Sequence, residues 1–139
     1  MNFDKSAGAV VFRRGKEGIL FLLLNYPEGH WDFTKGGIEK GEKEKETVKR
    51  EIKEETGLEN IEFVDGFEEL IRYFFKREGS LVLKTVKFFL IEAKEGDIKL
   101  SFEHNDFKWL PFKEAMEKTT FKNSKKVLEK ANDFLKKNG

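Results

Sequence analysis

The sequence predicts an α/β protein in which a mixed β-sheet is sandwiched between α-helices. Two β-branched and aliphatic runs, Ser6–Phe12 and Ile19–Leu24, flank a charged, glycine-bearing turn at Arg13–Gly18 and predict a hairpin. The segment Lys43–Thr56 lacks Pro and Gly and is rich in Glu and Lys, so it predicts a helix. Because further helical patterns follow the central strands, we expect helices on both faces of the sheet.

The middle of the chain supplies most of the expected sheet. His30–Phe33 is a short extended piece that leads into a loop at Lys35–Gly37. Two long strands are expected at Ile61–Phe75 and Leu81–Glu92, joined by a turn at Lys76–Ser80.

The last third of the chain predicts one strand and two helices. Asp106–Leu110 is a short strand, Pro111 begins a helical region over Phe112–Glu117, and Ser124–Lys137 is amphipathic. The apolar positions of that last helix are Val127, Leu128, Ala131, Phe134 and Leu135.

Length and composition narrow the class of protein. The 139 residues suit one compact domain over residues 1–139. A net charge of +1 shows no basic excess, so stable nucleic-acid binding is not expected. Without cysteine there is no disulfide framework or thiolate nucleophile, and two histidines are too few for a histidine metal cage. No long apolar run or leader is visible, which predicts a cytoplasmic protein with no membrane partner; the oligomeric state stays open.

The composition is also biased toward Lys, Glu and Phe, and Gln is absent. This bias resembles that of proteins from hot environments, which favour charged residues over thermolabile amides.

The most informative segment is GGIEKGEKEKETVKREIKEETGL, from Gly36 to Leu58, which joins a glycine loop to the predicted helix. Glu51, Glu54 and Glu55 stand at i, i+3 and i+4, so their carboxylates project from one helix face. Such crowding is unfavourable unless cations lie between the acids. Hard oxygen ligands suit Mg²⁺, or else Mn²⁺, completed by substrate phosphates. The expected ligand is therefore a phosphate ester or anhydride.

A second interpretation treats this Glu- and Lys-rich helix as a solvated face with Glu-to-Lys pairs. We assign that role to three acids early in the segment: Glu42, Glu44 and Glu46. Val48, Ile52 and Leu58 are expected to be the buried stripe of the helix, and Gly57 its stop.

The same segment fits the pattern G-x5-E-x7-R-E-U-x-E-E-x-G-U, where U is a bulky aliphatic residue, and so resembles the signature of the Nudix hydrolases. The motifs SAGAVVFRR, HWDFTKGGIEKGE, Lys84-Thr85-Val86 and SFEHNDFKWL extend the resemblance over most of the chain. Together they are similar to the asymmetrical diadenosine tetraphosphate hydrolases. That resemblance implies Mg²⁺-dependent attack of water on a phosphorus of a dinucleoside tetraphosphate, giving ATP and AMP from the diadenosine compound.

The resemblance also implies the site residues. The metal ligands would be the backbone carbonyl of Gly36 and the carboxylates of Glu51, Glu54, Glu55 and Glu103. Arg50 would brace a nearby carboxylate, and Glu54, Glu55 or Glu103 would accept the proton from water.

Four further residues would bind the substrate: Lys35 and Lys84 against the phosphates, and Tyr73 and Phe121 against adenine. In a chain with 15 Phe, the alternative for either aromatic ring is a place in the core.

Two departures from the related motifs affect the substrate assignment. Thr34 stands where many relatives have Pro, and Phe102 where the subgroup often has a second His. The alternatives are therefore a pyrophosphohydrolase of RNA 5′-triphosphate ends, ADP-ribose or an oxidised nucleoside triphosphate, and a catalytically inactive nucleotide sensor. An inactive domain should lack some of the conserved glutamates, and here none is missing.

Overall fold

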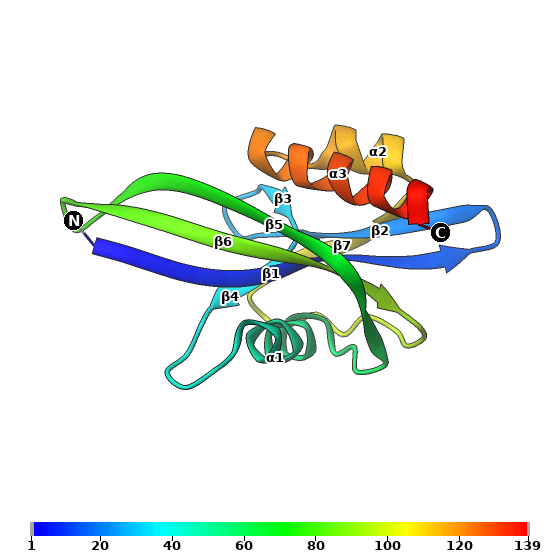
Figure 1. The fold of residues 1–139 in the computed structure, drawn as a ribbon, viewed down its shortest axis with the longest axis horizontal. Helices are drawn as coiled ribbons and strands as arrows, with labels where there is room; N and C mark the ends of the chain where they lie inside the picture. The colour runs from blue at the N-terminus through cyan, green and yellow to red at the C-terminus, as the bar shows by residue number, and fades with distance from the viewer. Residues whose placement is uncertain (1, 139) are drawn as a thin grey trace.

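A mixed seven-stranded sheet lies between helices in the computed structural model, which describes residues 2–138 (Figure 1). The strand order is β3-β2-β1-β6-β5, with β4 paired to β1 and β7 to β2. The elements are β1 (Asn2–Gly15), β2 (Gly18–Asn25), β3 (Trp31–Asp32), β4 (Thr34–Gly37), α1 (Glu44–Thr56), β5 (Ile61–Arg77), β6 (Ser80–Ala93), β7 (Asp106–Leu110), α2 (Phe112–Lys118) and α3 (Lys122–Asn138). The predicted fold class is confirmed.

Strand β1 is the centre of the sheet. It pairs antiparallel to β2, as the predicted hairpin requires, and parallel to β6, so the sheet is mixed. Its side chains alternate between two cores. Val10 and Phe12 pack with α2 and α3 on one face, whereas Ala7, Ala9 and Val11 pack with α1 on the other. The small alanines leave room for α1 against the sheet.

Helix α1 forms where the sequence predicts it. Val48 and Ile52 are fully buried against the sheet, and the side chain of Glu46 accepts a hydrogen bond from the backbone N–H of Lys43 at 2.8 Å. The helix ends at Gly57, whose φ of 76° is left-handed and whose N–H donates to the carbonyl of Lys53. Among residues 2–138, no helix is both long and apolar enough to cross a membrane.

The prediction of a loop at Lys35–Gly37 is wrong, because these residues belong to strand β4, which pairs antiparallel to β1. The close approach of the two strands depends on Gly8, where a Cβ would lie 2.4 Å from the carbonyl oxygen of Thr34. Helix α3 also begins at Lys122, two residues earlier than predicted.

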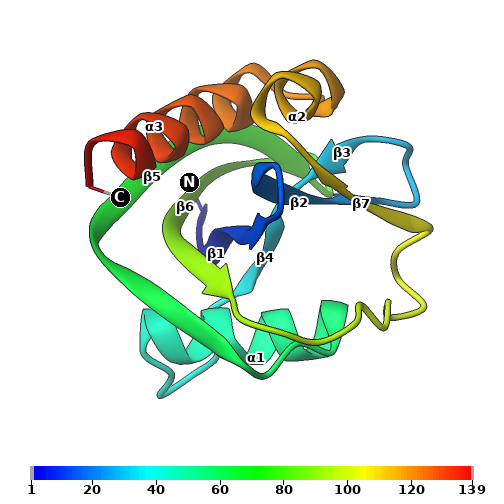
Figure 2. The same cartoon turned by 90° about the vertical axis from the view of Figure 1, so that its right-hand side faces the viewer.

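The segment between β6 and β7 runs beside α1, as the yellow trace in Figure 2 shows. Two backbone hydrogen bonds hold it there: Lys99 N–H donates to the carbonyl of Thr56 at 2.8 Å, and Ser101 N–H donates to that of Glu55 at 3.2 Å. These contacts bring Glu103 to the end of the helix that carries the other acids.

The buried face of α1 gives a test of the fold. We expect Ile52→Ala to lower the free energy of unfolding by about 2 to 5 kcal/mol, because it leaves a cavity in a fully buried site. Lys49→Ala, on the exposed side of the same helix, should change it by no more than about 0.5 kcal/mol. Urea unfolding measures both variants, and equal effects would contradict the assigned helix face.

Candidate active site

Two neighbouring cavities share Lys35. The first, which we call the carboxylate cavity, has a volume of about 420 Å³ and is lined by Tyr26, Pro27, Glu28, Lys35, Gly36, Glu51, Glu55, Glu103 and His104. The second, the aromatic cavity, has a volume of about 370 Å³ and is lined by Asp32, Lys35, Ile71, Tyr73, Phe121, Lys122, Asn123 and Ser124. A long ligand that passes Lys35 would therefore reach both cavities.

The carboxylate cavity brings together four of the five expected metal ligands, namely Gly36, Glu51, Glu55 and Glu103. Glu54 does not line it. Its side chain is 59% exposed, and its Oε2 lies 3.4 Å from Nη1 of Arg50.

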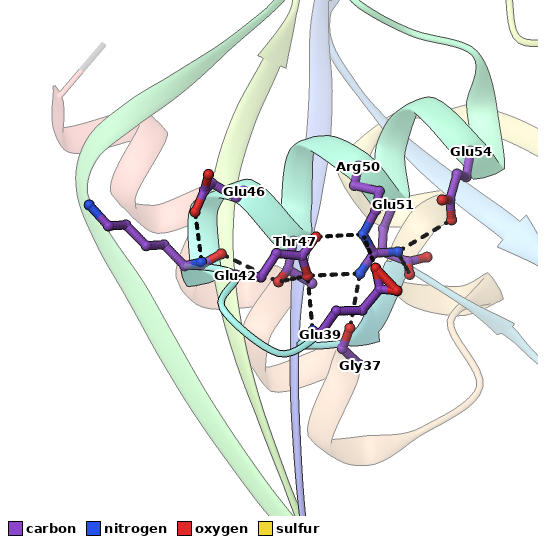
Figure 3. A network of polar contacts seen from close by, with 9 residues as sticks. Gly37, Glu39, Glu42, Glu46, Thr47, Arg50, Glu51 and Glu54 are labelled. Carbon is purple, nitrogen blue, oxygen red and sulfur yellow. Dashed lines mark hydrogen bonds and ion pairs between the residues drawn. The ribbon is translucent and has the colours of Figure 1, made fainter.

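Arg50 connects α1 to the strand and loop before it, as the dashed lines in Figure 3 show. Its Nε donates to Oε2 of Glu42 at 2.6 Å and its Nη2 to Oε1 of the same carboxylate at 3.0 Å. Nη1 donates to Oε1 of Glu51 at 2.7 Å, and Nη2 also donates to the carbonyl of Gly37 at 3.0 Å. The guanidinium thereby fixes Glu51 relative to β4.

The solvated role that the sequence suggested for Glu42, Glu44 and Glu46 is wrong for Glu42, whereas Glu46 is exposed and Glu44 is partly exposed and forms a Glu-to-Lys pair. Glu42 accepts hydrogen bonds from Arg50 and from the Thr47 hydroxyl, and Glu44 pairs with Lys87 of β6 at 3.1 Å. Glu46 caps the start of the helix. Glu42 occupies a fixed position of the pattern G-x5-E-x7-R-E-U-x-E-E-x-G-U, and this position is the sequence feature that indicates a structural role.

Gly36 allows the acid on α1 to lie directly against β4. A Cβ at Gly36 would lie 2.1 Å from Oε1 and Cδ of Glu51, so any other residue would displace that carboxylate. The backbone of Gly36 and the carboxylate of Glu51 consequently belong to one site.

Glu55 is a buried acid with an unsatisfied oxygen. It is 4% exposed, and its Oε1 has no hydrogen-bond partner. Burial, and then the neighbouring carboxylate of Glu51, raise the pKa of Glu55 to about 9. A cation beside this carboxylate would favour its ionised form.

These donors fit a hard divalent cation, because the cavity that contains Glu55 is lined by three further carboxylates, those of Glu28, Glu51 and Glu103, and by the backbone of Gly36. Within the part of the chain that the structure describes, however, no three acidic or histidine side chains already form a metal cage. Arg50 engages both Glu51 and Glu54 instead. It contacts one oxygen of each carboxylate, Oε1 of Glu51 and Oε2 of Glu54, so the second oxygen of each lies outside the contacts with Arg50.

Tyr26 and His104 also line the carboxylate cavity, although sequence reasoning gave them no role. The Tyr26 ring stacks on His30 at 4.7 Å and meets the His104 ring edge-on at 4.5 Å. Its hydroxyl donates to the carbonyl of Phe33 at 2.6 Å, and burial raises the pKa of Tyr26 well above its usual range. Burial likewise lowers the pKa of His104. No sequence pattern links these distant residues.

In the aromatic cavity, Phe121 is 46% exposed, and its ring lies 5.1 Å from that of His30. Tyr73 is half-buried and also packs against the core. The cavity thus contains one ring that packs against the core, Tyr73, and one ring that is about half exposed, Phe121.

The two expected phosphate-binding lysines occupy different positions. The Nζ of Lys35 lies 3.2 Å from Oδ2 of Asp32, a buried carboxylate that fixes the amine between the cavities. Lys84 lines neither cavity, but it pairs across the sheet with Tyr73. Burial, and then the charge of Lys35, lower the pKa of Lys84.

A family model described as the NUDIX domain matches residues 2–131. The chain belongs to the Nudix family. The assignment as a Nudix hydrolase made from the glycine-helix segment is confirmed.

Relatives of this Nudix chain have closely similar lengths and folds. The asymmetrical bis(5′-nucleosyl)-tetraphosphatase of Mus musculus is 34% identical over 143 residues, covering 94% of this chain and 95% of its own. The structure of the C. elegans Ap4A hydrolase in a binary complex matches this fold with a TM-score of 0.86 and 31% sequence identity. The match covers 96% of this chain and 98% of the C. elegans chain. An RNA pyrophosphohydrolase of a Nitratiruptor species is 36% identical over 118 residues, which cover 78% of this chain and 76% of the relative. The predicted similarity to the asymmetrical diadenosine tetraphosphate hydrolases is confirmed.

The ion pair of Arg50 with Glu42 gives a pH-dependent prediction. The hydrogen bond from Arg50 lowers the pKa of Glu42 from 4.5 to about 2. Because the folded state favours the ionised carboxyl, the pair stabilises the fold fully above about pH 4.5 and loses this effect as the pH falls toward 2. We therefore expect Glu42→Gln to lower the melting temperature at pH 7, by an amount that shrinks through this window.

Thermal melts from pH 7 to pH 2 measure the difference between the two proteins. Glu59→Gln serves as the control, since Glu59 is exposed and lies outside the Arg50 network. A difference for Glu42→Gln that stays constant with pH would exclude the ion pair as its cause.

Proposed function

We propose that this Nudix hydrolase cleaves dinucleoside tetraphosphates asymmetrically, by attack of water on a phosphorus, to give a nucleoside triphosphate and a monophosphate. The observation that carries the proposal is the junction of the carboxylate and aromatic cavities at Lys35. A base in the aromatic cavity would direct its phosphate chain past this amine to the acids. The names of the Mus musculus and C. elegans relatives support the same substrate.

The residues of the carboxylate cavity would hold Mg²⁺, which supplies a water of lowered pKa and neutralises charge on the leaving phosphate. The proposed ligands are the carbonyl of Gly36 and the carboxylates of Glu51, Glu54, Glu55 and Glu103. Arg50 orients Glu51 without touching the substrate. Glu54, Glu55 or Glu103 accepts the proton of the attacking water.

Substrate contacts are assigned on either side of Lys35. Lys35, held by Asp32, would neutralise phosphate oxygens, and Lys84 would add positive charge from the strand position opposite Tyr73. Tyr73 and Phe121 present rings to an adenine in the aromatic cavity. The substrate is a small nucleotide, and a cytoplasmic location stays a prediction from the sequence.

A second candidate is removal of pyrophosphate from RNA 5′-triphosphate ends. The relative of that name in the Nitratiruptor species supports it at 36% identity. The same cavities would accept a terminal nucleotide with its phosphates, so substrate preference has to separate the two activities.

The decisive experiment incubates the purified chain and Mg²⁺ with diadenosine tetraphosphate, 5′-triphosphorylated RNA, ADP-ribose and an oxidised nucleoside triphosphate at equal concentrations. We expect the first to be hydrolysed fastest, to ATP and AMP in equal amounts. Two molecules of ADP would refute asymmetrical cleavage, and faster turnover of RNA would favour the second candidate. Product analysis in ¹⁸O-labelled water identifies the phosphorus that is attacked.

The metal assignment is tested at Glu54. We expect Glu54→Gln to lower kcat by roughly 10³-fold, beyond the roughly 10- to 100-fold typical when only an outer partner of a ligand is lost. The fold should survive because this side chain is exposed. Steady-state kinetics at saturating Mg²⁺ and a thermal melt measure the two effects. Glu59→Gln is the matched control, and a kcat as high as in that control would remove Glu54 from the site.

The adenine assignment is tested at Phe121 and Tyr73. Stacking on one base contributes about 1 to 3 kcal/mol, so Phe121→Ala should raise KM for diadenosine tetraphosphate by roughly 5- to 150-fold with a smaller effect on kcat. Tyr73→Ala should do the same and also lower stability, since Tyr73 packs against the core.

Phe74→Ala is the control for both rings, because Phe74 is 57% exposed and its side chain alternates to the other face of β5. KM values and melting temperatures of all three variants distinguish a ring that stacks on adenine from a ring that packs in the core. A lowered melting temperature with unchanged KM would assign the ring to the core instead.

A further inference from the structure

His104 faces Glu55 inside the carboxylate cavity. Its Nε2 lies 3.6 Å from Oε1 of Glu55, and both side chains are buried. Neither atom has a hydrogen-bond partner. Two buried polar atoms without partners are rare in folded proteins, and here they point at one another. Their separation of 3.6 Å exceeds the normal range of about 2.7 to 3.2 Å for an N–H···O bond, so a direct bond requires the two side chains to approach by about 0.4 Å.

The other side of the His104 ring is fixed by Ser101. The Ser101 hydroxyl oxygen lies 3.2 Å from Nδ1 of His104 and also accepts a hydrogen bond from the backbone N–H of Glu103 at 3.3 Å. While Oγ accepts from that amide, the hydroxyl can still donate its own proton to Nδ1. A ring that accepts at Nδ1 carries its proton on Nε2, which faces Glu55.

The surroundings hold the ring in this orientation. Tyr26 packs edge-on against it, and the Tyr26 hydroxyl is engaged by the carbonyl of Phe33. The backbone N–H of Ser101 donates to the carbonyl of Glu55, so the loop is attached to the end of α1. The position of the ring is therefore set by the fold.

We propose that His104 is a positioning residue, which donates its Nε2–H to Glu55 and, through Ser101, fixes the backbone of Glu103. One imidazole thereby sets the spacing of two carboxylates that come from α1 and from the β6–β7 segment. This role rests on the proposed function only in that Glu55 and Glu103 belong to the hydrolytic site. In this role His104 acts through Glu55 and Glu103 and not by direct contact with the substrate.

An outer partner of this kind prepares a carboxylate for a metal ion. Loss of such a partner lowers metal affinity or activity by roughly 10- to 100-fold. The effect should appear in metal binding and kcat, and KM for the nucleotide should stay within about threefold because the ring lies away from the aromatic cavity.

The first test measures the tautomer of His104 in the metal-free chain by ¹⁵N NMR of the imidazole rings. The chain has two histidines, so a His30→Asn sample assigns the signals. We expect the proton of His104 on Nε2 and protected from solvent exchange. A ring protonated on Nδ1 alone would overturn the proposal.

The second test compares His104→Phe with His104→Gln by titration with Mn²⁺ in the absence of nucleotide. Phe keeps the packing but removes the donor, whereas the amide of Gln places an N–H near the position of Nε2. We expect Phe to weaken Mn²⁺ binding by roughly 10- to 100-fold and Gln to stay within a few fold of the unmodified chain. Equal loss in both variants, or no loss in either, would overturn the proposal.

If His104→Phe fails to fold, Ser101→Ala and Ser101→Thr take its place. Ala removes the hydroxyl that holds Nδ1, and Thr keeps it. Weaker Mn²⁺ binding in Ala alone supports the role of the ring, and equal binding in the two variants contradicts it. Both tests omit nucleotide, so inactivity toward diadenosine tetraphosphate would refute the proposed function and leave these results intact.

Discussion

The guanidinium of Arg50 is the interaction on which the site depends. Carboxylates at Glu51, Glu54 and Glu55 repel one another on a single helix face, and Arg50 offsets this by engaging the first two. Its bidentate bond to Glu42 and its contact with the carbonyl of Gly37 fix the cation itself. Glu51 is thus held against β4 by one planar group that also contacts Glu54. A lysine could supply the charge but not this fork of donors.

Two glycines allow the close contacts on which the carboxylate cavity depends, one between two strands and one between a strand and a carboxylate. Gly8 admits β4 beside β1, and Gly36 admits the carboxylate of Glu51 beside β4. Lys35, which pairs with Gly8 and precedes Gly36, then lies at the junction of the two cavities. The aromatic cavity and the carboxylate cavity are therefore adjacent, because both are lined by the same residue of the short strand β4. The same strand carries the backbone carbonyl that is proposed to bind metal.

Most features of helix α1 could be predicted from the sequence, because they depend on residues within a few positions of one another. The spacing of Glu51, Glu54 and Glu55 fixes their common face, the stripe of Val48 and Ile52 fixes the buried side, and Gly57 marks the helix end. The errors arise where pairing with distant chain decides the outcome. Lys35–Gly37 reads as a loop until β1 is placed beside it, and Glu42 reads as solvated until Arg50 folds back eight residues. His104 joins Glu55 only because the β6–β7 segment returns along α1, and no periodicity encodes that path.

The parallel pairing of β1 with β6 bears on the order of assembly. Its partners are 80 positions apart in the sequence, from Asn2 with Val82 to Phe12 with Glu92. Closing so long a loop costs entropy before any contact repays it, and sheets of this kind fold slowly. The core beneath α1 draws on both strands, through Ala7 and Val11 of β1 and Phe89 and Ile91 of β6. The surface on which α1 packs is therefore complete only when β1 and β6 have paired, so the arrangement of the acids on α1 depends on a contact between distant parts of the chain.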